Sequence, residues 1–360
     1  MGKLTFPGGI HPNEGKKLTM DKPVVEYLPK GDCVYPLSQH IGAPAVPIVK
    51  KGDRVLAGQK IAEAAGFVSA NIHASISGTV KVIEPRMTSS GSKVNSIVIE
   101  NDGLFESVDY SQNKMDLETL YRDDVRNIIK EAGIVGMGGA GFPANVKLTP
   151  KNEDEIDYII VNGAECEPYL TSDYRRMIEE PEKLIHGLEI CINLFDNAKG
   201  IIAIEDNKPE AIKLLRELTK DNDKITVNEL KTKYPQGAER QLIYANTGRY
   251  VNSKMLPADA GCIVHNVDTV VAIYEAVVEG KPLISRIVTV TGDAIKEPRN
   301  FLVRTGTNCQ ELIEAAGGFK DDKMPEKIIA GGPMMGPTMY TLDVATTKTS
   351  SALLCLTPAE

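Results

Sequence analysis

The sequence of 360 residues lacks several features that would assign it to a class at once. It contains no run of about 18 apolar residues, so it predicts no membrane-spanning helix. Its first residues form no apolar segment of signal-peptide length, and we therefore expect a protein of the cytoplasm. Basic residues are not in excess, because the formal net charge is -8 and the pI is about 5.4. A nucleic-acid partner would need a basic face, so we expect none.

Cysteine is also sparse, and its spacing argues against one class of site. No two of the six cysteines form a Cys-x-x-Cys pair, which is the usual arrangement of zinc and iron–sulfur ligands. In a cytoplasmic protein they are most simply reduced thiols, often buried. We therefore expect no metal site in this stretch of sequence.

The most informative stretch is Gly-Met-Gly-Gly-Ala-Gly-Phe-Pro at positions 136–143. Glycine carries no Cβ and tolerates positive φ, so a phosphate or a planar ligand can approach the backbone closely. Successive amides of such a loop form an anion-binding nest. The glycine spacing also matches a dinucleotide fingerprint, but a helical pattern precedes it where that fingerprint needs a strand. A structural glycine turn therefore stays open as an alternative.

Two acids, Glu165 and Glu167, follow in the stretch Asn-Gly-Ala-Glu-Cys-Glu-Pro. Residues two apart on an extended segment share a face, so the pair predicts a shared role beside the glycine loop. Helix capping and simple solvent exposure are alternatives that position alone leaves open. A glycine cradle followed by clustered acids suggests a site for a nucleotide-type cofactor.

Three kinds of pattern follow one another along the chain. Residues 36–100 read as short β-strands with Gly-containing turns, and they resemble the barrel-sandwich module of biotinyl and lipoyl carriers. The carrier lysine is missing from their hairpin at 63–71, so we expect a structural or docking module. Strands and helices then alternate, which predicts an α/β domain with a largely parallel sheet. Glu165 and Asn266 directly follow strands, where such sheets bind ligands. Residues 285–345 suggest a small β-grasp fold.

Several separated motifs resemble the RnfC family, a component of the Rnf complex, which is a membrane-associated ferredoxin:NAD oxidoreductase of bacteria. They are GGIHP at 8–12, LSQHIGAP at 37–44, GMGGAGFPANVKL at 136–148 and VNGAECEPYLTSDY at 161–174. The resemblance covers essentially the whole chain. A more distant similarity runs to the flavin-bearing, NADH-oxidising subunit of respiratory complex I.

This resemblance implies bound FMN, with NAD(H) as the substrate that visits it. The residues implied to hold FMN are Gly136, Gly138, Gly139 and Lys147 at the ribityl chain and phosphate, Asn162 and Glu165 beside the isoalloxazine, Gly237, Ala238 and Glu239 at the pocket's closing wall, and Asn266 and Thr269 near the phosphate. Phe142 and Glu167 are implied to lie toward the NADH. No side chain needs to act as a nucleophile, because the flavin supplies the hydride chemistry.

The fold class that follows is α/β and multi-domain, with a Rossmann-like parallel-sheet FMN domain between an N-terminal all-β barrel-sandwich domain and a β-grasp (SLBB) domain. The expected domains are an N-terminal arm at 1–35, the barrel-sandwich hybrid domain at 36–112, the FMN- and NADH-binding domain at 113–282, the β-grasp domain at 283–345, and a tail at 346–360.

The sequence also departs from its relatives. The RnfC family continues into two ferredoxin-like 4Fe–4S clusters, whose cysteine motifs are absent here, so we expect a chain truncated before them. Met137 replaces an arginine of the complex I loop, Ala164 replaces an aspartate of its acid cluster, and Ala144-Asn145 replaces a common Thr-His. Phosphate and nicotinamide contacts could therefore differ in detail.

The expected function is to pass electrons between NAD(H) and iron–sulfur clusters or ferredoxin through FMN, coupled to ion translocation. The implied partners are the other Rnf subunits, membrane subunits included, with ferredoxin indirectly. The implied location is peripheral, on the cytoplasmic side of the cell membrane. Two alternatives stay open: a related electron-transfer component of a cobalamin or proline reductase, and a non-catalytic docking scaffold.

Overall fold

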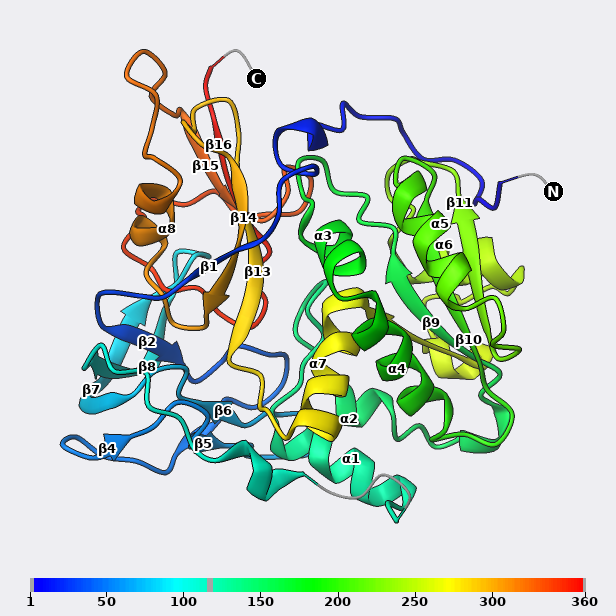
Figure 1. Ribbon diagram of the computed structural model, residues 1–360, viewed down its shortest axis with the longest axis horizontal. Helices are drawn as coiled ribbons and strands as arrows, with labels where there is room; N and C mark the ends of the chain where they lie inside the picture. Colours follow the sequence, from blue (N-terminus) through cyan, green and yellow to red (C-terminus); the bar gives the residue numbers. More distant parts are fainter. Residues whose placement is uncertain (1–2, 115–118, 359–360) are drawn as a thin grey trace.

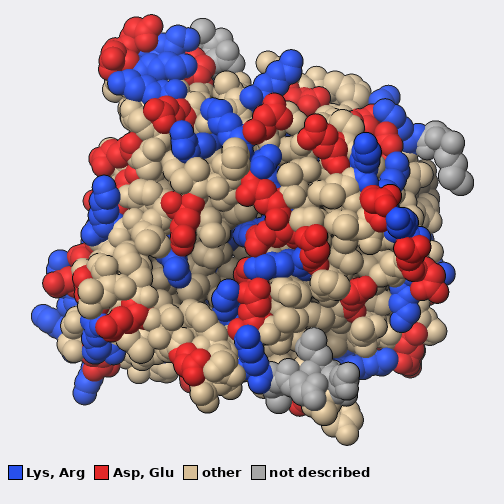
Figure 2. All heavy atoms as spheres, in the orientation of Figure 1, with Lys and Arg blue, Asp and Glu red and all other residues tan. Residues whose placement is uncertain are grey.

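The computed structural model describes residues 3–114 and 119–358, which form three β-containing units side by side (Figure 1). No helix among these residues is long and apolar enough to cross a bilayer. On the face that Figure 2 shows, basic and acidic side chains are interspersed, which is typical of an ordinary solvated surface.

The first unit is a sandwich of two small sheets. One sheet has the order β2 (Cys33–Pro36), β8 (Lys93–Asn101), β7 (Gly78–Met87) and β4 (Arg54–Val55), and the other has the order β3 (Val46–Pro47), β5 (Lys60–Glu63) and β6 (Ile72–His73). Their inward side chains, among them Tyr35, Ile61 and Ile97, form one buried core. This is the packing expected of two half-buried antiparallel sheets.

The second unit is built on a four-stranded parallel sheet. Its order is β11 (Ile225–Leu230), β10 (Lys199–Glu205), β9 (Tyr158–Gly163) and β12 (Cys262–Asn266). Successive residues of β9 alternate between two cores: Ile159 and Val161 belong to one, and Ile160 to the other. Such burial on both faces explains the unbroken apolar runs of these strands.

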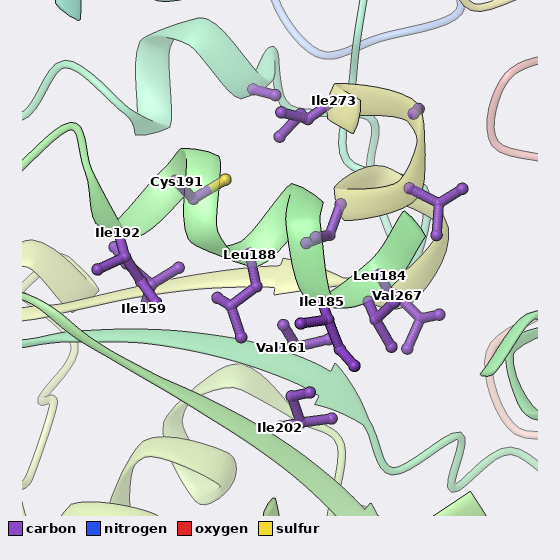
Figure 3. Packing of buried hydrophobic residues seen from close by; sticks show 14 of the residues in the cluster. Ile159, Val161, Leu184, Ile185, Leu188, Cys191, Ile192, Ile202, Val267 and Ile273 are labelled. Atoms are coloured by element: carbon purple, nitrogen blue, oxygen red, sulfur yellow. The ribbon is translucent and has the colours of Figure 1, made fainter. Parts of the chain in front are cut away.

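Helices cover both faces of this sheet. One face carries α4 (Pro181–Ile192), α5 (Pro209–Leu218) and α7 (Val267–Glu279), and the other carries α6 (Glu239–Thr247). Figure 3 shows Ile185 and Leu188 of α4 on the side of Val161 of β9, with Leu184 beside Val267 of α7. The shorter elements of this unit are α1 (Arg122–Glu131), α2 (Ala144–Lys147), η3 (Glu153–Glu155), α3 (Ser172–Glu179) and η4 (Pro257–Ala260).

The third unit is a five-stranded mixed sheet with one helix. Its order is β1 (Val25–Tyr27), β14 (Arg299–Arg304), β13 (Ser285–Thr291), β16 (Ala352–Leu356) and β15 (Lys327–Ala330). Helix α8 (Cys309–Ala315) packs on it through Leu312 and Ile313. The chain thus has the expected class, a parallel-sheet α/β unit between an all-β unit and a β-grasp unit. Two short 3-10 helices, η1 (Lys16–Leu18) and η2 (Tyr110–Asn113), lie in the connections.

Two segments are more integrated than their sequence suggested. Residues 352–356, which we expected in a tail, form β16 between β13 and β15. All five of their side chains are buried, so this short apolar run is a central strand. The segment 1–35, expected as an irregular arm, contributes the edge strand β1 and a bridge from Leu4 to Leu230 of the α/β unit. The strand β16 therefore completes the sheet of the third unit, while the N-terminal segment pairs with both the third unit and the α/β unit.

Candidate cofactor site

The glycine loop closes on itself directly after α1. Val135 pairs with Pro143, and the Gly136 amide donates to the Phe142 carbonyl at 2.8 Å. Gly136 and Phe142 therefore form the base of the loop, and the Phe142 side chain is half-buried. The tip, residues 138–140, is exposed.

The tip of this loop offers unused amide groups. The Met137 amide donates to the Thr269 hydroxyl at 2.9 Å, so the first turn of α7 holds the loop in place. The amides of Gly138, Gly139 and Ala140 donate to no group in the part of the chain that the structure describes. A Cβ built on Gly139 would meet no described atom within 4 Å, so the space above it is open. An exposed run of free amides beside open space fits a phosphate or a planar ring.

Two asparagines lie side by side at the carboxyl edge of the parallel sheet. Asn162 of β9 and Asn266 of β12 are cross-strand partners. Asn162 donates to the Gly237 carbonyl at 2.7 Å, which ties β9 to the loop before α6. Asn266 caps α7 by accepting from the Asp268 amide at 2.8 Å, and it donates to Asp173 at 2.8 Å. Both asparagine side chains therefore build the edge on which the glycine loop rests.

The glycine at position 237 allows this edge to pack closely. A Cβ there would lie 3.2 Å from the Cys166 sulfur and 3.4 Å from the Asn162 oxygen. The Gly237 amide donates to that sulfur at 3.3 Å. Ala238 follows as the N-cap residue of α6, half-buried. Burial raises the pKa of the Cys166 thiol to about 11, so it is a neutral thiol at this wall.

Lys147 brings a positive charge to the same edge. Its ammonium lies 2.7 Å from the Glu239 carboxylate and donates to the Val264 carbonyl at 2.8 Å. Val264 belongs to β12, and Glu239 is the first residue of α6. The Lys147 side chain is 30% exposed, so its charge remains accessible from solvent.

Glu165 and Glu167 point in different directions, contrary to a shared face. Glu165 has a φ of +48°, which turns the chain between them. Its carboxylate accepts from the Asp173 and Tyr174 amides at 2.8 and 3.3 Å, so it caps α3. The Glu167 carboxylate instead accepts from the Met334 amide at 3.0 Å, in the loop after β15. The helix-capping alternative is thus the one observed for Glu165, and Glu167 faces the β-grasp unit.

Burial and nearby acids also tune the carboxyl groups of this region. Burial raises the pKa of Glu165 and that of Glu167. Burial, reinforced by the Glu165 and Asp268 charges, raises the pKa of Asp173 to about 7. Burial alone would also raise the pKa of Asp268, but the guanidinium groups of Arg176 and Arg286 hold it below its ordinary value. Asp268 is therefore ionised, whereas the carboxyl groups of Glu165, Glu167 and Asp173 bind a proton more readily than usual.

Two buried lysines that sequence reasoning missed hold the acid segment in place. The Lys16 ammonium donates to the carbonyls of Glu165, Glu167 and Leu170 at 2.9, 3.0 and 2.7 Å. The Lys208 ammonium donates to the Ala164 carbonyl at 2.6 Å. Burial lowers the pKa of Lys16 to about 8. Their local sequence reads like that of surface lysines, and no periodic pattern sets them apart.

A buried charge network, also missed, connects the glycine loop to the β-grasp unit. Asp268 lies 2.7 Å from Arg176 and 2.9 Å from Arg286. Arg286 of β13 also donates to the Met137 carbonyl at 3.1 Å. Breaking such a buried pair by removing one partner costs about 3–5 kcal/mol, so the network fixes the loop firmly.

The structure thus brings most of the predicted residues to one place. The residues that share the carboxyl edge with the loop are Gly136, Gly138, Gly139, Lys147, Asn162, Gly237, Ala238, Glu239, Asn266 and Thr269. The Glu165 carboxylate is instead engaged by the first turn of α3, and the Glu167 side chain points to the neighbouring unit.

Comparison with family models divides the chain into three matched parts. The RnfC barrel sandwich hybrid domain matches residues 4–104, the Nuo51 FMN-binding domain matches 129–275, and the SLBB domain matches 287–338. The glycine loop and the whole carboxyl edge fall within the FMN-binding match. A solved NAD+-reducing NiFe-hydrogenase in the air-oxidised state has a TM-score of 0.53 at 19% identity. It covers 67% of this chain and 47% of its own, and it shows the fold alone.

Curated relatives cover the chain almost completely. The C subunit of the proton-translocating ferredoxin:NAD(+) oxidoreductase complex of Clostridium ljungdahlii is 49% identical over 98% of this chain and 77% of its own. The C subunit of the Na(+)-translocating ferredoxin:NAD(+) oxidoreductase complex of Acetobacterium woodii is 46% identical over 98% of this chain and 79% of its own. The C subunit of the ion-translocating oxidoreductase complex of Vibrio cholerae is 40% identical over 100% of this chain and 46% of its own. On this identity and coverage, the chain belongs to the RnfC family of ion-translocating oxidoreductase complexes.

Proposed function

We propose that this chain is an NADH-linked, FMN-carrying electron-transfer subunit of an ion-translocating ferredoxin:NAD(+) oxidoreductase complex. One observation carries the proposal. The exposed loop tip with its unused amides lies at the carboxyl edge of a parallel sheet, inside the segment that matches an FMN-binding domain. Open α/β sheets bind their ligands at this edge.

The loop and its neighbours would hold the flavin through distinct contacts. The free amides of Gly138 and Gly139 provide hydrogen-bond donors for a phosphate or ribityl oxygen. Lys147 adds a point charge beside them. Asn162 and Gly237 form the close-packed wall against which a ring would lie.

The remaining residues would act indirectly or on the substrate. Gly136, Asn266 and Thr269 are engaged by the fold, so they would position the loop rather than bind through their side chains. Glu165 would orient α3 at the back of the site, since its carboxylate is used as a cap. Phe142 and Glu167 would lie toward the visiting NADH.

When bound, FMN would supply the exchange between two-electron hydride chemistry and single-electron transfer. The chain's part is to bind it, orient it and exclude water from one side. Ala238 and Glu239, at the start of α6, would close the pocket on the side of Lys147.

We further propose that the electrons pass to two 4Fe–4S clusters of the full-length protein and indirectly to ferredoxin. Within the described residues no group of three metal-ligating side chains is gathered. The proposed partners are other subunits of the complex, membrane subunits among them. The proposed position is peripheral, on the cytoplasmic side of the membrane.

The test is a titration of the purified chain with FMN, followed by NADH and ferricyanide. We expect flavin fluorescence to be quenched on binding and NADH to be oxidised only with FMN present. A folded protein that takes up no flavin would refute the proposal for this chain. Flavin uptake without any NADH oxidation would favour the docking scaffold.

A further inference from the structure

The barrel-sandwich unit exposes an apolar surface that its own fold does not cover. The large exposed side chains there are Ile41, Val46, Ile48 and Phe67, with exposed fractions of 46, 55, 49 and 76%. We call these four residues the apolar patch. Single apolar side chains are normal on a protein surface, whereas a contiguous group of them marks an interaction site.

One half of the apolar patch is the outer face of an edge strand. In the described chain β3 pairs with β5 alone, so its other edge is open. Along β3 and its continuation, Val46, Ile48 and Lys50 are exposed. Pro47 and Val49 between them are half-buried, and Val49 packs on the core of the unit. A strand with a solvated outer face carries polar residues there, so two β-branched residues indicate a face that another surface covers.

The other half is the hairpin that joins β5 to β6, which includes Phe67. The Ala43 amide donates to the Val68 carbonyl at 2.9 Å, and this bond joins the segment that carries Ile41 to the hairpin. Gly42 has a φ of +99°, and a Cβ there would lie 2.0 Å from the Val68 carbonyl oxygen. Only glycine allows this close approach. The apolar patch is therefore preformed, and a partner would bind it without first ordering a loop.

The apolar patch borders the glycine loop of the candidate cofactor site. The Ile41 amide donates to the Gly141 carbonyl at 3.4 Å. A Cβ on Gly141 would lie 3.0 Å from the His40 Cα, so the two segments are in direct contact. A protein bound to the patch would therefore also lie beside the exposed loop tip at 138–140. This position suits a partner that exchanges electrons with a cofactor held at the loop.

The charges at the rim of the apolar patch favour an acidic partner. Lys50 and Lys51 are exposed, and in the part of the chain that the structure describes neither ammonium pairs with an acid. Of the nearby acids, Glu63 is paired with Lys60 at 3.4 Å, and Asp53 accepts from the Lys50 amide at 2.9 Å. The rim is thus positive on balance, which attracts carboxylates across an interface. The whole chain has a net charge of -8, which disfavours an anionic lipid surface as the occupant.

We propose that the apolar patch is the docking surface of a protein that exchanges electrons with the cofactor and meets Lys50 and Lys51 with carboxylates. The partner is expected among the other subunits of the complex. Its role in electron exchange rests on the proposed function, whereas the docking surface rests on the patch itself.

The test uses the full-length protein, produced together with the other subunits of its complex. Phe67→Asp and Ile48→Asp are compared with Leu104→Asp. Leu104 is the matched control, because it is 65% exposed on the same unit but follows β8 of the other sheet. A charge at the centre of an interface is expected to weaken association about 30-fold or more, so the other subunits should no longer copurify with either patch variant. They should copurify with Leu104→Asp as with wild type.

Activity and salt dependence separate docking from the cofactor site. All three variants should keep FMN binding and NADH–ferricyanide turnover, because none of the substituted residues belongs to that site. The two patch variants should lose the NADH-linked ferredoxin turnover of the complex in proportion to the lost subunits. Association of the wild type should weaken as NaCl is added, and the double variant Lys50→Ala/Lys51→Ala should show a smaller salt dependence.

Four results would overturn the proposal. A wild type that copurifies with no other subunit would contradict docking, as would copurification retained in both folded patch variants. Sedimentation of the wild-type chain alone with phosphatidylglycerol vesicles, lost in Phe67→Asp, would assign the patch to the membrane. A dimer of the chain alone that becomes monomeric in Phe67→Asp would assign it to a second copy. If the protein binds no flavin but the patch variants still lose the other subunits, the docking surface stands and only its role in electron exchange falls.

Discussion

Replacing Gly139 by alanine should weaken ligand binding without lowering the stability of the fold. Nothing in the described chain requires glycine there, since its φ is not in the left-handed region and a Cβ would meet no atom within 4 Å. Alanine at such a position leaves stability unchanged or raises it by about 0.4–1 kcal/mol, because it restricts the unfolded chain. The added methyl group would, however, occupy the space in front of the free loop amides.

The expected cost falls on binding alone. Displacing an oxyanion from one charge-assisted hydrogen bond costs about 1.5–3 kcal/mol, which corresponds to roughly 10- to 100-fold in the FMN dissociation constant. Flavin fluorescence quenching measures the affinity, and thermal unfolding without flavin measures the stability. FMN affinity equal to wild type, in a protein that does bind FMN, would refute a ligand at the loop tip.

Gly138→Ala is the matched control for this reasoning. A Cβ at position 138 would lie 3.1 Å from the Asn266 side chain, so the hydrogen bond from Asn266 to Asp173 must shift. We therefore expect Gly138→Ala to lower the unfolding temperature without ligand, unlike Gly139→Ala. If both variants were equally unstable, the open space above Gly139 would not be real.

Three further predictions concern the charged groups around the site. Lys147→Met should weaken FMN binding about tenfold or more, because it removes a charge directed at the phosphate. Riboflavin has no phosphate, so its binding should weaken much less. Equal losses of affinity for both ligands would argue against a contact between Lys147 and the phosphate. Glu165→Ala should lower the free energy of unfolding by about 0.5–2 kcal/mol, because the α3 cap is lost. Glu165→Gln keeps a hydrogen-bond acceptor, so its free energy of unfolding should fall less. Urea titration of the two variants measures this difference. Burial lowers the pKa of Lys348 to about 7. The unfolded chain then binds more protons between that pH and the ordinary lysine pKa, so this group's contribution to stability rises with pH, by about 2 kcal/mol from pH 7 to 9. Urea titrations of wild type and Lys348→Met should diverge by that amount, and a constant difference between them would contradict the buried cation.

Much of the fold could be predicted, because long apolar runs and helical periodicity are visible in the local sequence. The apolar runs at 156–161 and 201–204 match β9 and β10, since strands buried on both faces have no polar alternation. The strand β16 was not recognised, because a five-residue apolar run gives no periodicity and its partners lie more than 20 residues away. The same holds for β1, which pairs with a strand near position 300. Long-range pairing of short strands leaves no local signal.

The candidate site shows the same division between local and distant signals. The glycine loop and Asn266 could be found, since glycine density and strand ends are local features of the sequence. The roles of Glu165 and Glu167 were misjudged as a shared face, because a positive φ at a non-glycine residue reverses the chain there. Lys16 could not be found, since its carbonyl partners lie 149 or more positions away along the chain. Arg286 could not be found either, since its partners Met137 and Asp268 belong to another unit.

The central claim is that the carboxyl edge around the glycine loop binds a flavin that NADH can reduce. The most direct measurement is the visible spectrum of the FMN-loaded chain, recorded without oxygen before and after addition of NADH. We predict that the flavin stays with the protein through gel filtration and that NADH bleaches its visible band, with both effects weakened in Gly139→Ala. Flavin that elutes free of a correctly folded chain would contradict the account, as would a bound flavin that NADH leaves oxidised.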